Sequence, residues 1–506
     1  DNENEEEDEF LLRFSRQLLT RVRASDRREM LEQAQPVLAE VRAEEMNRAI
    51  ADLRRLGVDW SEGPDGGPSP VRVEVSTNRP DNVGRAGEPF SVRVRVTNEG
   101  DAPLFRLRGT TKSDYRLFDD RELVFGRLNP GETKEWTTTL GTCTTENDER
   151  VCRLPRDTPD RADGIKIEFD ELHGHAPEPA ELRTRVEALP RPQFAYYVQV
   201  ADDIEGNGDG RLQRGEHASL YLRVRNVGRG RTFDTHANLR NLSGRGILLR
   251  DGRFRIDDIA PGEERLVRFT FEVLEDFERD ETKLELSVID ADLRESISEK
   301  VIVPILPGGS TPAARSGRVT LSPGAVVRAA PDAEAEILAE VEGGGLSLPA
   351  EATLDGFVRV RLGEEQVAWV AESQLGNGQG GSLEFQLNHA PPRIEVDYGG
   401  TLVTRENSIT LRGTAVDETL VRDLYIFAGA RKVHYRSTRR ADDRTRVSFE
   451  TEIPMHGGIN YITVFARESD EIVSRRLIVV RRDAPDGSLM ETPRFDDDVF
   501  GNVHYE

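Results

Sequence analysis

Residues 94–100 read VRVTNEG, and residues 222–228 read LRVRNVG. In both stretches apolar residues alternate with polar ones and lead into a Gly-containing turn. Alternation with a period of two indicates a β-strand with one buried face. Each stretch is followed by a Pro-Gly-Glu turn, LNPGE at 128–132 and IAPGE at 259–263. The chain therefore repeats one β-unit, and we predict two β-sandwiches, at about 71–190 and 191–306.

The composition predicts several small domains. A chain of 506 residues exceeds what one hydrophobic core supports, and 32% of its residues are charged. The net charge of -24 argues against a DNA- or RNA-binding protein, which needs a basic face to neutralise phosphate. The longest apolar runs fall far short of the roughly 20 residues of a membrane helix, so we expect no membrane span.

The second β-unit contains a pattern typical of a calcium loop, EGNGDGRLQRGE at 205–216. It has the ligand spacing of the twelve-residue EF-hand loop, with a glycine at position 6 and a closing glutamate at 12. The predicted calcium ligands are Glu205, Asn207, Asp209, the backbone carbonyl of Arg211, and Glu216. The flanking segments alternate as strands rather than helices, so we expect a structural Ca²⁺ between two strands.

The first β-unit offers an internal comparison for this loop. Aligning Gly87 with Gly215 sets Thr77 against Glu205 and Arg79 against Asn207, so two oxygen ligands are missing there. Asp81 still falls against Asp209. The alternative is an ordinary Gly/Asn/Asp turn without an ion, because Asn-Gly and Asp-Gly pairs commonly form turns.

Two cysteines, Cys143 and Cys152, flank a short polar loop. We predict a disulfide across a hairpin, which requires an oxidising compartment. The alternatives are two free thiols, or a zinc site completed by His173 and His175.

The remaining parts follow from composition and periodicity. An acidic lead at 1–8 precedes a predicted helical hairpin at 9–60, whose second helix is capped by Asp26 and ended by Gly57. Residues 61–70 and 306–317 are rich in Gly and Pro, residues 376–382 are rich in Gly, and all three segments are predicted linkers. A third β-sandwich is predicted at 391–482, and the acidic, turn-rich tail at 483–506 is predicted to be disordered.

Residues 318–375 resemble a bacterial SH3 domain. The resemblance lies in GAVVRAAPDAEAEILAEVEGG at 324–344, FVRVRL at 357–362 and VAWVAESQL at 367–375. It implies a small barrel that binds peptidoglycan or peptides, or packs beside a catalytic domain. The stretch 343–355, GGGLSLPAEATLD, departs from the family because we expect no definite strand there. We expect Phe357 and Trp369 to belong to the core. The segment GGINYITVFARE at 457–468 is similar to a strand of bacterial immunoglobulin-like domains, so the sandwiches are expected to be immunoglobulin-like.

The order of these parts resembles the long C-terminal extension of exported, myxobacterial-type S41 peptidases, the PDZ-containing carboxyl-terminal processing proteases. The matching stretches are LGVDWSEGP at 56–64, TKSDYRLFDDRELVFGRLNPGE at 111–132, FAYYVQVADDIEGNGDGRLQRGE at 194–216 and ANLRNLSGRGI at 237–247. The resemblance implies export to the periplasm or cell exterior and a peptidase domain upstream. It also implies a role in binding proteins or peptidoglycan in the envelope.

The motifs of common hydrolases, HExxH, the P-loop and GxSxG, do not occur in the sequence. We therefore expect a non-catalytic interaction or scaffold region rather than an enzyme. The alternative is an independent structural or adhesion protein of the cell envelope, built from immunoglobulin-like modules.

Overall fold

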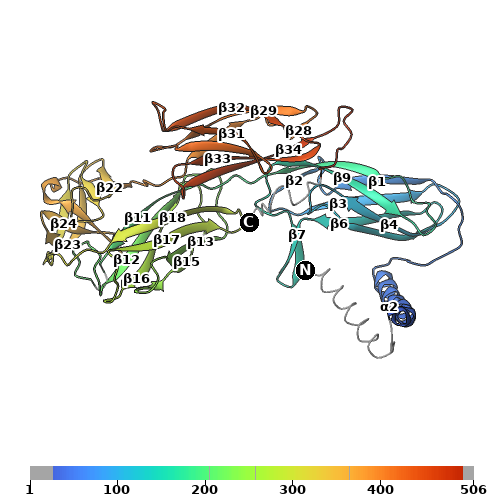
Figure 1. Ribbon diagram of the computed structural model, residues 1–506, viewed down its shortest axis with the longest axis horizontal. Coiled ribbons are helices and arrows are strands. Elements are labelled where there is room, and N and C mark those ends of the chain that lie inside the picture. The colour runs from blue at the N-terminus through green and yellow to red at the C-terminus, as the bar shows by residue number, and fades with distance from the viewer. Residues whose placement is uncertain (1–26, 204–205, 257, 364, 494–506) are drawn as a thin grey trace. The chain divides into compact units, whose positions relative to one another are not determined.

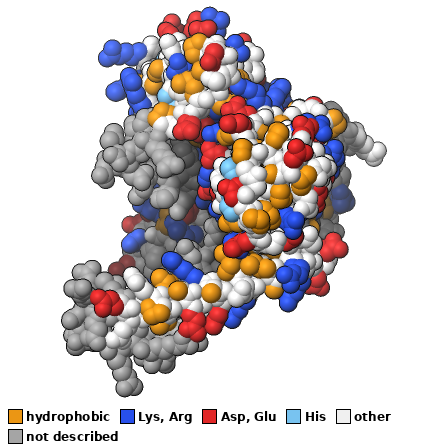
Figure 2. Space-filling model, turned by 90° about the vertical axis from the view of Figure 1, so that its right-hand side faces the viewer, with side chains coloured by type: hydrophobic (Ala, Val, Ile, Leu, Met, Phe, Trp, Pro, Cys, Tyr) orange, Lys and Arg blue, Asp and Glu red, His pale blue; other side chains and the backbone are white. Residues whose placement is uncertain are grey.

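The computed structural model describes residues 27–493, except 204–205, 257 and 364. These residues are mainly β-structure, as predicted (Figure 1). On the face that Figure 2 draws, acidic and basic side chains are interspersed and hydrophobic atoms form small patches, as the highly charged composition suggests. No helix in the described part of the chain is long and apolar enough to cross a membrane.

Helix α2 spans Arg27–Arg55 and ends as the sequence predicts. Gly57 has a φ of +80° and donates its N–H to the carbonyl of Arg54, while the N–H of Val58 donates to the carbonyl of Leu53. A glycine in the left-handed region commonly ends a helix in this way. The first helix of the predicted hairpin, its capping residue Asp26 and the acidic lead at 1–8 lie outside the described residues.

The first repeat forms two sheets, which we call the first sheet pair. One sheet has the order β1 (Val71–Thr77), β3 (Phe90–Asn98) and β6 (Thr133–Leu140). The other has the order β2 (Val83–Arg85), β10 (Ala180–Glu187), β9 (Arg161–Asp170), β4 (Leu104–Lys112) and β5 (Glu122–Leu128). A separate hairpin joins β7 (Thr142–Glu146) to β8 (Glu149–Arg153). Alternate residues of β3 are fully buried, so the period-two pattern of the sequence marks its inner face.

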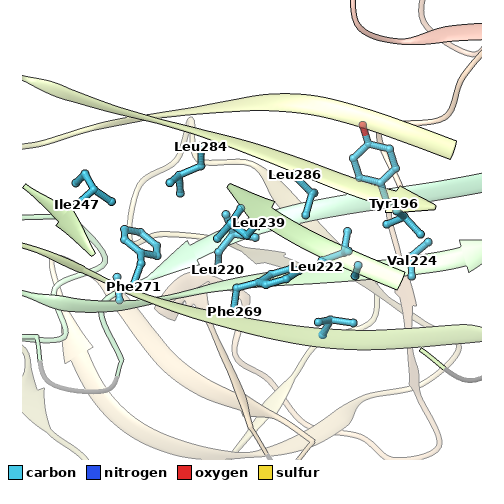
Figure 3. Close-up of a cluster of buried hydrophobic side chains, with 14 of the residues drawn as sticks. Tyr196, Leu220, Leu222, Val224, Leu239, Ile247, Phe269, Phe271, Leu284 and Leu286 are labelled. Atoms are coloured by element: carbon cyan, nitrogen blue, oxygen red, sulfur yellow. The ribbon is translucent and has the colours of Figure 1, made fainter. Parts of the chain in front are cut away.

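The second repeat forms the second sheet pair, with four strands in each sheet. One sheet has the order β11 (Phe194–Ala201), β12 (His217–Asn226), β16 (Glu264–Val273) and β14 (Ile247–Asp251). The other has the order β15 (Arg253–Ile256), β13 (Thr235–Asn241), β17 (Glu281–Asp290) and β18 (Glu295–Pro304). Their inner faces share one apolar core, in which Leu220, Leu222, Phe269 and Phe271 lie against Leu239 and Leu286 (Figure 3).

The two repeats use the same buried asparagine in the same way. In each, the side-chain amide donates to two carbonyls: Asn98 to Ala102 and Leu128, and Asn226 to Gly230 and Ile259. In each, the side-chain oxygen accepts the N–H two residues later, at 3.0 Å. The Pro-Gly-Glu turns also match, since Gly131 and Gly262 donate their N–H to the carbonyls of Asn98 and Asn226. The two copies of the sequence repeat therefore form the same set of hydrogen bonds.

The next segment forms one sheet of eight strands. Its order is β19 (Ala313–Ala314), β23 (Leu346–Leu354), β24 (Phe357–Leu362), β25 (Gln366–Ala371), β21 (Val326–Arg328), β22 (Ile337–Glu342) and β26 (Ser382–Phe385), with β20 (Arg318–Leu321) paired to β23. Strand β23 lies in the stretch where no definite strand was expected, so that expectation was wrong. Its Ala350 and Ala352 are buried, and small side chains on a paired strand suffice to line a core. Trp369 is buried, and the helical turn η1 spans Glu372–Gln374.

The predicted linkers on either side of this sheet are hydrogen-bonded rather than free. Residues 306–317 supply β19, and the N–H of Leu306 donates to the carbonyl of Leu212. In residues 376–382, the N–H of Gly376 donates to Thr320 and that of Gly381 to Gly345. Glycine is common both in flexible linkers and where two backbones approach closely. The glycine content of these segments therefore did not show which of the two they are.

The third sheet pair closes the described chain. One sheet has the order β27 (Arg393–Asp397), β29 (Ser408–Val416) and β32 (Arg446–Pro454). The other has the order β28 (Val403–Thr404), β34 (Val473–Arg482), β33 (Gly458–Arg467), β30 (Asp423–Ala428) and β31 (Arg431–Ser437). The tail predicted to be disordered begins with ordered contacts: Arg481 pairs with the buried Asp483 and also donates to the carbonyl of Met490. The prediction was wrong for residues 483–493, because local composition does not reveal these contacts; residues 494–506 lie outside the described range.

Candidate functional site

The calcium-type loop connects β11 to β12 and is anchored at its centre. Leu212 is buried in the core of the second sheet pair and pairs through its backbone with Ile305, next to β18. Gly208 and Gly210 have φ values of +75° and +78°, which only glycine adopts without strain. The predicted ligand Glu205 lies outside the described residues.

Asp209 is the hub of the loop, with only 1% of its surface exposed. Its Oδ1 accepts the N–H of Arg211 at 2.9 Å. Its Oδ2 accepts from the side chains of Asn207 and Gln213 and from the N–H of Gly309. The Asn207 oxygen in turn accepts the N–H of Asp209. The structure thus brings together two of the predicted ligands, and hydrogen bonds already order this part of the loop.

Glu216 closes the loop from the start of β12. Its two carboxylate oxygens accept the N–H of Asn207 at 3.1 Å and of Gln213 at 2.9 Å. Burial raises the pKa of Glu216 above its ordinary value, and the nearby charge of Asp209 adds to the rise. This carboxylate therefore binds the same loop residues as Asp209, as the predicted ligand spacing requires.

Asp202 is a further carboxylate of the site, and the sequence pattern did not include it among the ligands. It is 5% exposed, and its Oδ1 accepts the N–H of Gly210 at 3.0 Å. Its Oδ2 is buried without a hydrogen-bond partner in the described structure. Burial is the main cause that raises the pKa of Asp202 to about 6, and Glu216 and Asp209 raise it further. The signal in the sequence was the Asp202–Asp203 pair directly after the β11 pattern.

The three carboxylates Asp202, Asp209 and Glu216 are all more than nine-tenths buried. None of them forms an ion pair with a Lys or Arg of the described chain. Burying a carboxylate without a cation costs free energy, and the raised pKa values of Asp202 and Glu216 express that cost. The donor chemistry of the loop, with carboxylate, amide and carbonyl oxygens, is that of a Ca²⁺ site.

The described residues contain no group of three His, Cys, Asp or Glu side chains arranged to hold a metal ion. The carboxylate oxygens of Asp209 and Glu216 are occupied by the hydrogen bonds given above. A bound Ca²⁺ would therefore replace some of these hydrogen bonds, and the partnerless Oδ2 of Asp202 is the oxygen that loses least by turning to a cation.

The loop also contacts the eight-stranded sheet. Arg359 of β24 donates from Nη1 to the carbonyl of Gly208 at 3.1 Å. A Cβ at Gly210 would lie 2.6 Å from Cδ of Pro331 and 3.3 Å from Nε1 of Trp369. The loop is therefore part of the junction between the second sheet pair and the eight-stranded sheet. The prediction of a structural Ca²⁺ between two strands did not include this contact.

A buried polar network extends the same junction along β11. Gln366 of β25 donates to the side-chain oxygen of Gln199 at 2.6 Å, and Gln199 donates to the carbonyl of Val367 at 2.8 Å. The hydroxyl of Tyr197 lies 3.1 Å from the Gln366 side chain. Buried amides need partners, and these bonds supply them. Sequence reasoning missed them, since the partners are more than a hundred positions apart.

The corresponding turn of the first repeat is built without buried carboxylates. Asp81, which aligns with Asp209, is exposed and accepts the N–H of Val83 at 3.1 Å. The Thr77 hydroxyl donates to the carbonyl of Arg79. Gly87 and Gly215 share the left-handed conformation, with φ values of +81° and +80°. Both repeats therefore have the same backbone conformation at the aligned glycine, but only the turn of the second repeat contains buried carboxylates.

Cys143 and Cys152 are paired across β7 and β8 and are joined by a disulfide. The zinc alternative is contradicted by the geometry. Both sulfurs are in the disulfide, Nε2 of His173 lies 2.9 Å from the carbonyl of Gly63, and Nε2 of His175 lies 2.9 Å from Oδ1 of Asp65.

Comparisons with known proteins leave the family open. No protein-family model matches the chain, and no curated protein matches it. Among solved structures, a transglutaminase of red sea bream is 14% identical with a TM-score of 0.18, and the match covers 47% of this chain and 32% of that one. The YadV chaperone is 14% identical with a TM-score of 0.16 over 46% of this chain and 99% of its own. This chain thus matches about a third of the transglutaminase.

Proposed function

We propose that the chain is a non-catalytic interaction and scaffold region of an exported protein, and that Ca²⁺ in the 206–216 loop stabilises it. The ligands are Asn207, Asp209, the Arg211 carbonyl and Glu216, with Asp202 as the additional carboxylate. The observation that carries the calcium site is the set of three buried carboxylates without a cation, one of which has a partnerless oxygen. A divalent cation would offset the charge that burial makes costly.

The proposed architecture is a series of immunoglobulin-like sandwiches with an SH3-like barrel between the second and third. The paired sheets, the repeated Asn98 and Asn226 networks and the small eight-stranded sheet support it. A role in scaffolding is supported by the junction itself. Hydrogen bonds from Gln199, Gln366 and Arg359 link the proposed barrel to its neighbouring sandwich.

Export to the periplasm or cell exterior is supported by the disulfide between Cys143 and Cys152, which persists in an oxidising compartment. With the resemblance to the extensions of S41 peptidases, the disulfide leads us to propose protein or peptidoglycan partners in the envelope and a peptidase domain upstream.

Terbium luminescence on the full chain tests the metal site directly. Tb³⁺ replaces Ca²⁺ in such sites, and Trp369 lies close enough to the loop to transfer its excitation energy. We expect an emission that saturates, that Ca²⁺ displaces, and that Asp209→Asn abolishes. The matched control is Asp81→Asn, which makes the same change in the first repeat and should leave the emission unchanged. Equal emission from both variants would refute the site.

An immunoblot tests the scaffold assignment. An antibody raised against this chain should detect, in an extract of the source cells, a band well above the chain's 56.7 kDa if a peptidase lies upstream. A single band at 56.7 kDa would instead favour the independent envelope protein.

A further inference from the structure

The third sheet pair has one outer face that is aromatic. In β30, Leu424 and Ile426 point into the core, so Tyr425, which lies between them, and Phe427, which follows Ile426, point outward. Neighbouring strands add Phe465, Tyr435 and other large apolar side chains to the same face. Tyr435 is 57% exposed, Leu477 38% and Tyr461 36%.

The strand register gathers these side chains into one surface, which we call the aromatic face. Cross-strand pairing sets Tyr425 opposite both Tyr435 on β31 and Phe465 on β33. Phe427 is set opposite Lys432 on β31. Side chains that face each other across strands in this way lie within contact distance.

The rings on this face form a compact cluster. Tyr425 and Phe465 are stacked, with their centroids 5.0 Å apart. Phe427 meets both rings edge-on, at 5.8 Å and 6.0 Å. Tyr, Phe and Arg side chains in a well-packed cluster are enriched at the centre of protein interfaces.

Lys432 lies at the centre of the cluster. Its ammonium is 5.3 Å from the ring centre of Tyr425, 5.7 Å from Phe427 and 5.8 Å from Tyr435. It forms no ion pair with an acidic residue of the described chain. Arg467, also beside Tyr425, is already held by Asp423 through two bonds of 2.8 Å. Lys432 therefore gives the aromatic face a positive charge without an acidic partner, and Arg475, opposite Phe465 on β34, donates only to the carbonyl of Arg294.

The opposite sheet of the same pair provides a contrast. Its outer face carries side chains that neutralise one another, such as Arg412 with Glu450 at 2.8 Å and Arg393 with Glu395 at 3.4 Å. Alternation alone therefore does not produce an aromatic outer face. The difference points to contact with something other than water.

Strand β31 is the edge of the aromatic sheet. In the described structure its backbone pairs with β30 on one side only. The edge carries Arg431, Lys432 and Arg436, which are all exposed. Basic side chains on an edge strand repel an identical edge, which argues against a second copy of this chain as the occupant. The same charges favour an acidic strand.

We propose that the aromatic face and the edge of β31 form a docking surface for an extended acidic polypeptide segment. The segment adds to the sheet as a strand beside β31. Its carboxylates lie beside Lys432, and its apolar side chains pack on Tyr435 and the ring cluster. This proposal is independent of the calcium site, since it rests on a different sheet pair.

A synthetic peptide of alternating Glu and Val tests the surface on the full chain, with fluorescence anisotropy as the readout. We expect saturable binding that Lys432→Glu weakens by about tenfold or more. Lys432 is exposed, so this change should leave the fold intact, which circular dichroism checks. The matched control is Arg412→Glu, the same change of charge on the opposite sheet, which should bind as the unaltered chain does.

Two further arms separate the alternatives. A peptide with alternate backbone nitrogens methylated keeps its charge but cannot pair as a strand, so we expect it not to bind. If it binds equally well, strand addition is wrong. If Lys432→Glu binds the Glu-Val peptide unchanged, the surface is wrong. If only an anionic polysaccharide such as alginate binds in a Lys432-dependent manner, the occupant is not a polypeptide and the proposal fails.

Discussion

Asp202 accepts the backbone N–H of Gly210 at 3.0 Å with one carboxylate oxygen, while its other oxygen is buried without a partner. This bond joins the end of β11 to the middle of the candidate calcium loop. The bond holds the buried carboxylate of Asp202 at the loop, where a bound cation would lower the free-energy cost of burying its charge. The stability of the loop should therefore depend on both pH and calcium.

The first prediction concerns pH. Burial raises the pKa of Asp202 to about 6 from an ordinary value of 3.8. A carboxyl whose pKa is raised on folding stabilises the fold below pH 3.8 and loses that contribution as the pH rises through about 6. At 1.36 kcal/mol per pKa unit, the loss without metal is on the order of 3 kcal/mol. Ca²⁺ competes with the proton, so the calcium-induced rise in Tm should grow across this window. A calcium effect that is equal at both ends of the window would contradict the assignment.

The second prediction concerns Asp202→Asn, whose effect should change sign with calcium. In chelator near neutral pH, the amide removes a buried charge, so the free energy of unfolding should rise by about 1–3 kcal/mol. In saturating Ca²⁺ the same variant loses a ligand and should be less stable than the unaltered chain. Urea unfolding under the two conditions measures both. A variant that is destabilised equally in chelator and in calcium would mean that Asp202 only holds Gly210.

The third prediction separates backbone strain from domain contact. Gly210 and Gly262 have φ values of +78° and +83°, so alanine is strained at both, by about 1 kcal/mol. A Cβ at Gly262 meets nothing within 4 Å, whereas at Gly210 it lies 2.6 Å from the ring of Pro331. Gly210→Ala should therefore also speed amide hydrogen exchange at the junction, in β11 and in residues 329–332. If Gly262→Ala produces the same exchange pattern, the loop does not hold the junction.

The fourth prediction tests the repeat. Asn98→Ala and Asn226→Ala each remove two donors to buried carbonyls and one acceptor. We expect each to lower the free energy of unfolding of its own repeat by roughly 2–4 kcal/mol. Site-resolved hydrogen exchange should show the loss in the altered repeat alone. If only one of the two variants lowers the free energy of unfolding by this amount, the two networks do not contribute equally to stability.

The sequence predicts the features that are encoded within a few positions. Val92, Val94 and Val96 alternate with polar residues, and the structure buries all three. The Asn and Pro-Gly-Glu stretches mark equivalent turns because a turn depends on its own residues. The spacing of Asn207, Asp209 and Glu216 predicts that these residues come together. The Asn207 side chain donates to Asp209, and the Glu216 carboxylate accepts the backbone N–H of Asn207.

Features that depend on distant partners were not predictable in this way. Gln199 and Gln366 look like ordinary polar residues of strands, and only the fold places them 2.6 Å apart. The tail at 483–493 has the composition of a disordered segment, but Asp483 forms a buried ion pair with Arg481 of β34. Asp202 is an intermediate case: the Asp202–Asp203 pair is visible in the sequence beside the twelve-residue pattern, but only the backbone path of the loop shows that Asp202 binds Gly210.

The fifth prediction concerns His389, which follows the eight-stranded sheet and pairs through its backbone with Tyr196 of β11. Its ring stacks on that of Tyr196 at 5.2 Å, and carboxylates of Glu299 and Glu336 lie 3.5 Å and 3.7 Å from its two nitrogens. The Glu336 bond, with the nearby charges of Glu299, Glu336 and Glu468, raises the pKa of His389 above its ordinary 6.5 although burial opposes the rise.

A histidine whose pKa is raised on folding contributes stability below about pH 6.5 and loses it as the pH rises through the folded-state pKa. The backbone pairing of Tyr196 with His389 should therefore open more often in mildly alkaline solution, which hydrogen exchange at these two amides reports. His389→Gln should remove the pH dependence. His236→Gln is the control, because His236 also lies 3.2 Å from a carboxylate, that of Asp234. If the exchange of His389→Gln still accelerates with pH beyond its intrinsic rate, the carboxylates alone govern the pairing and His389 is not the group that titrates.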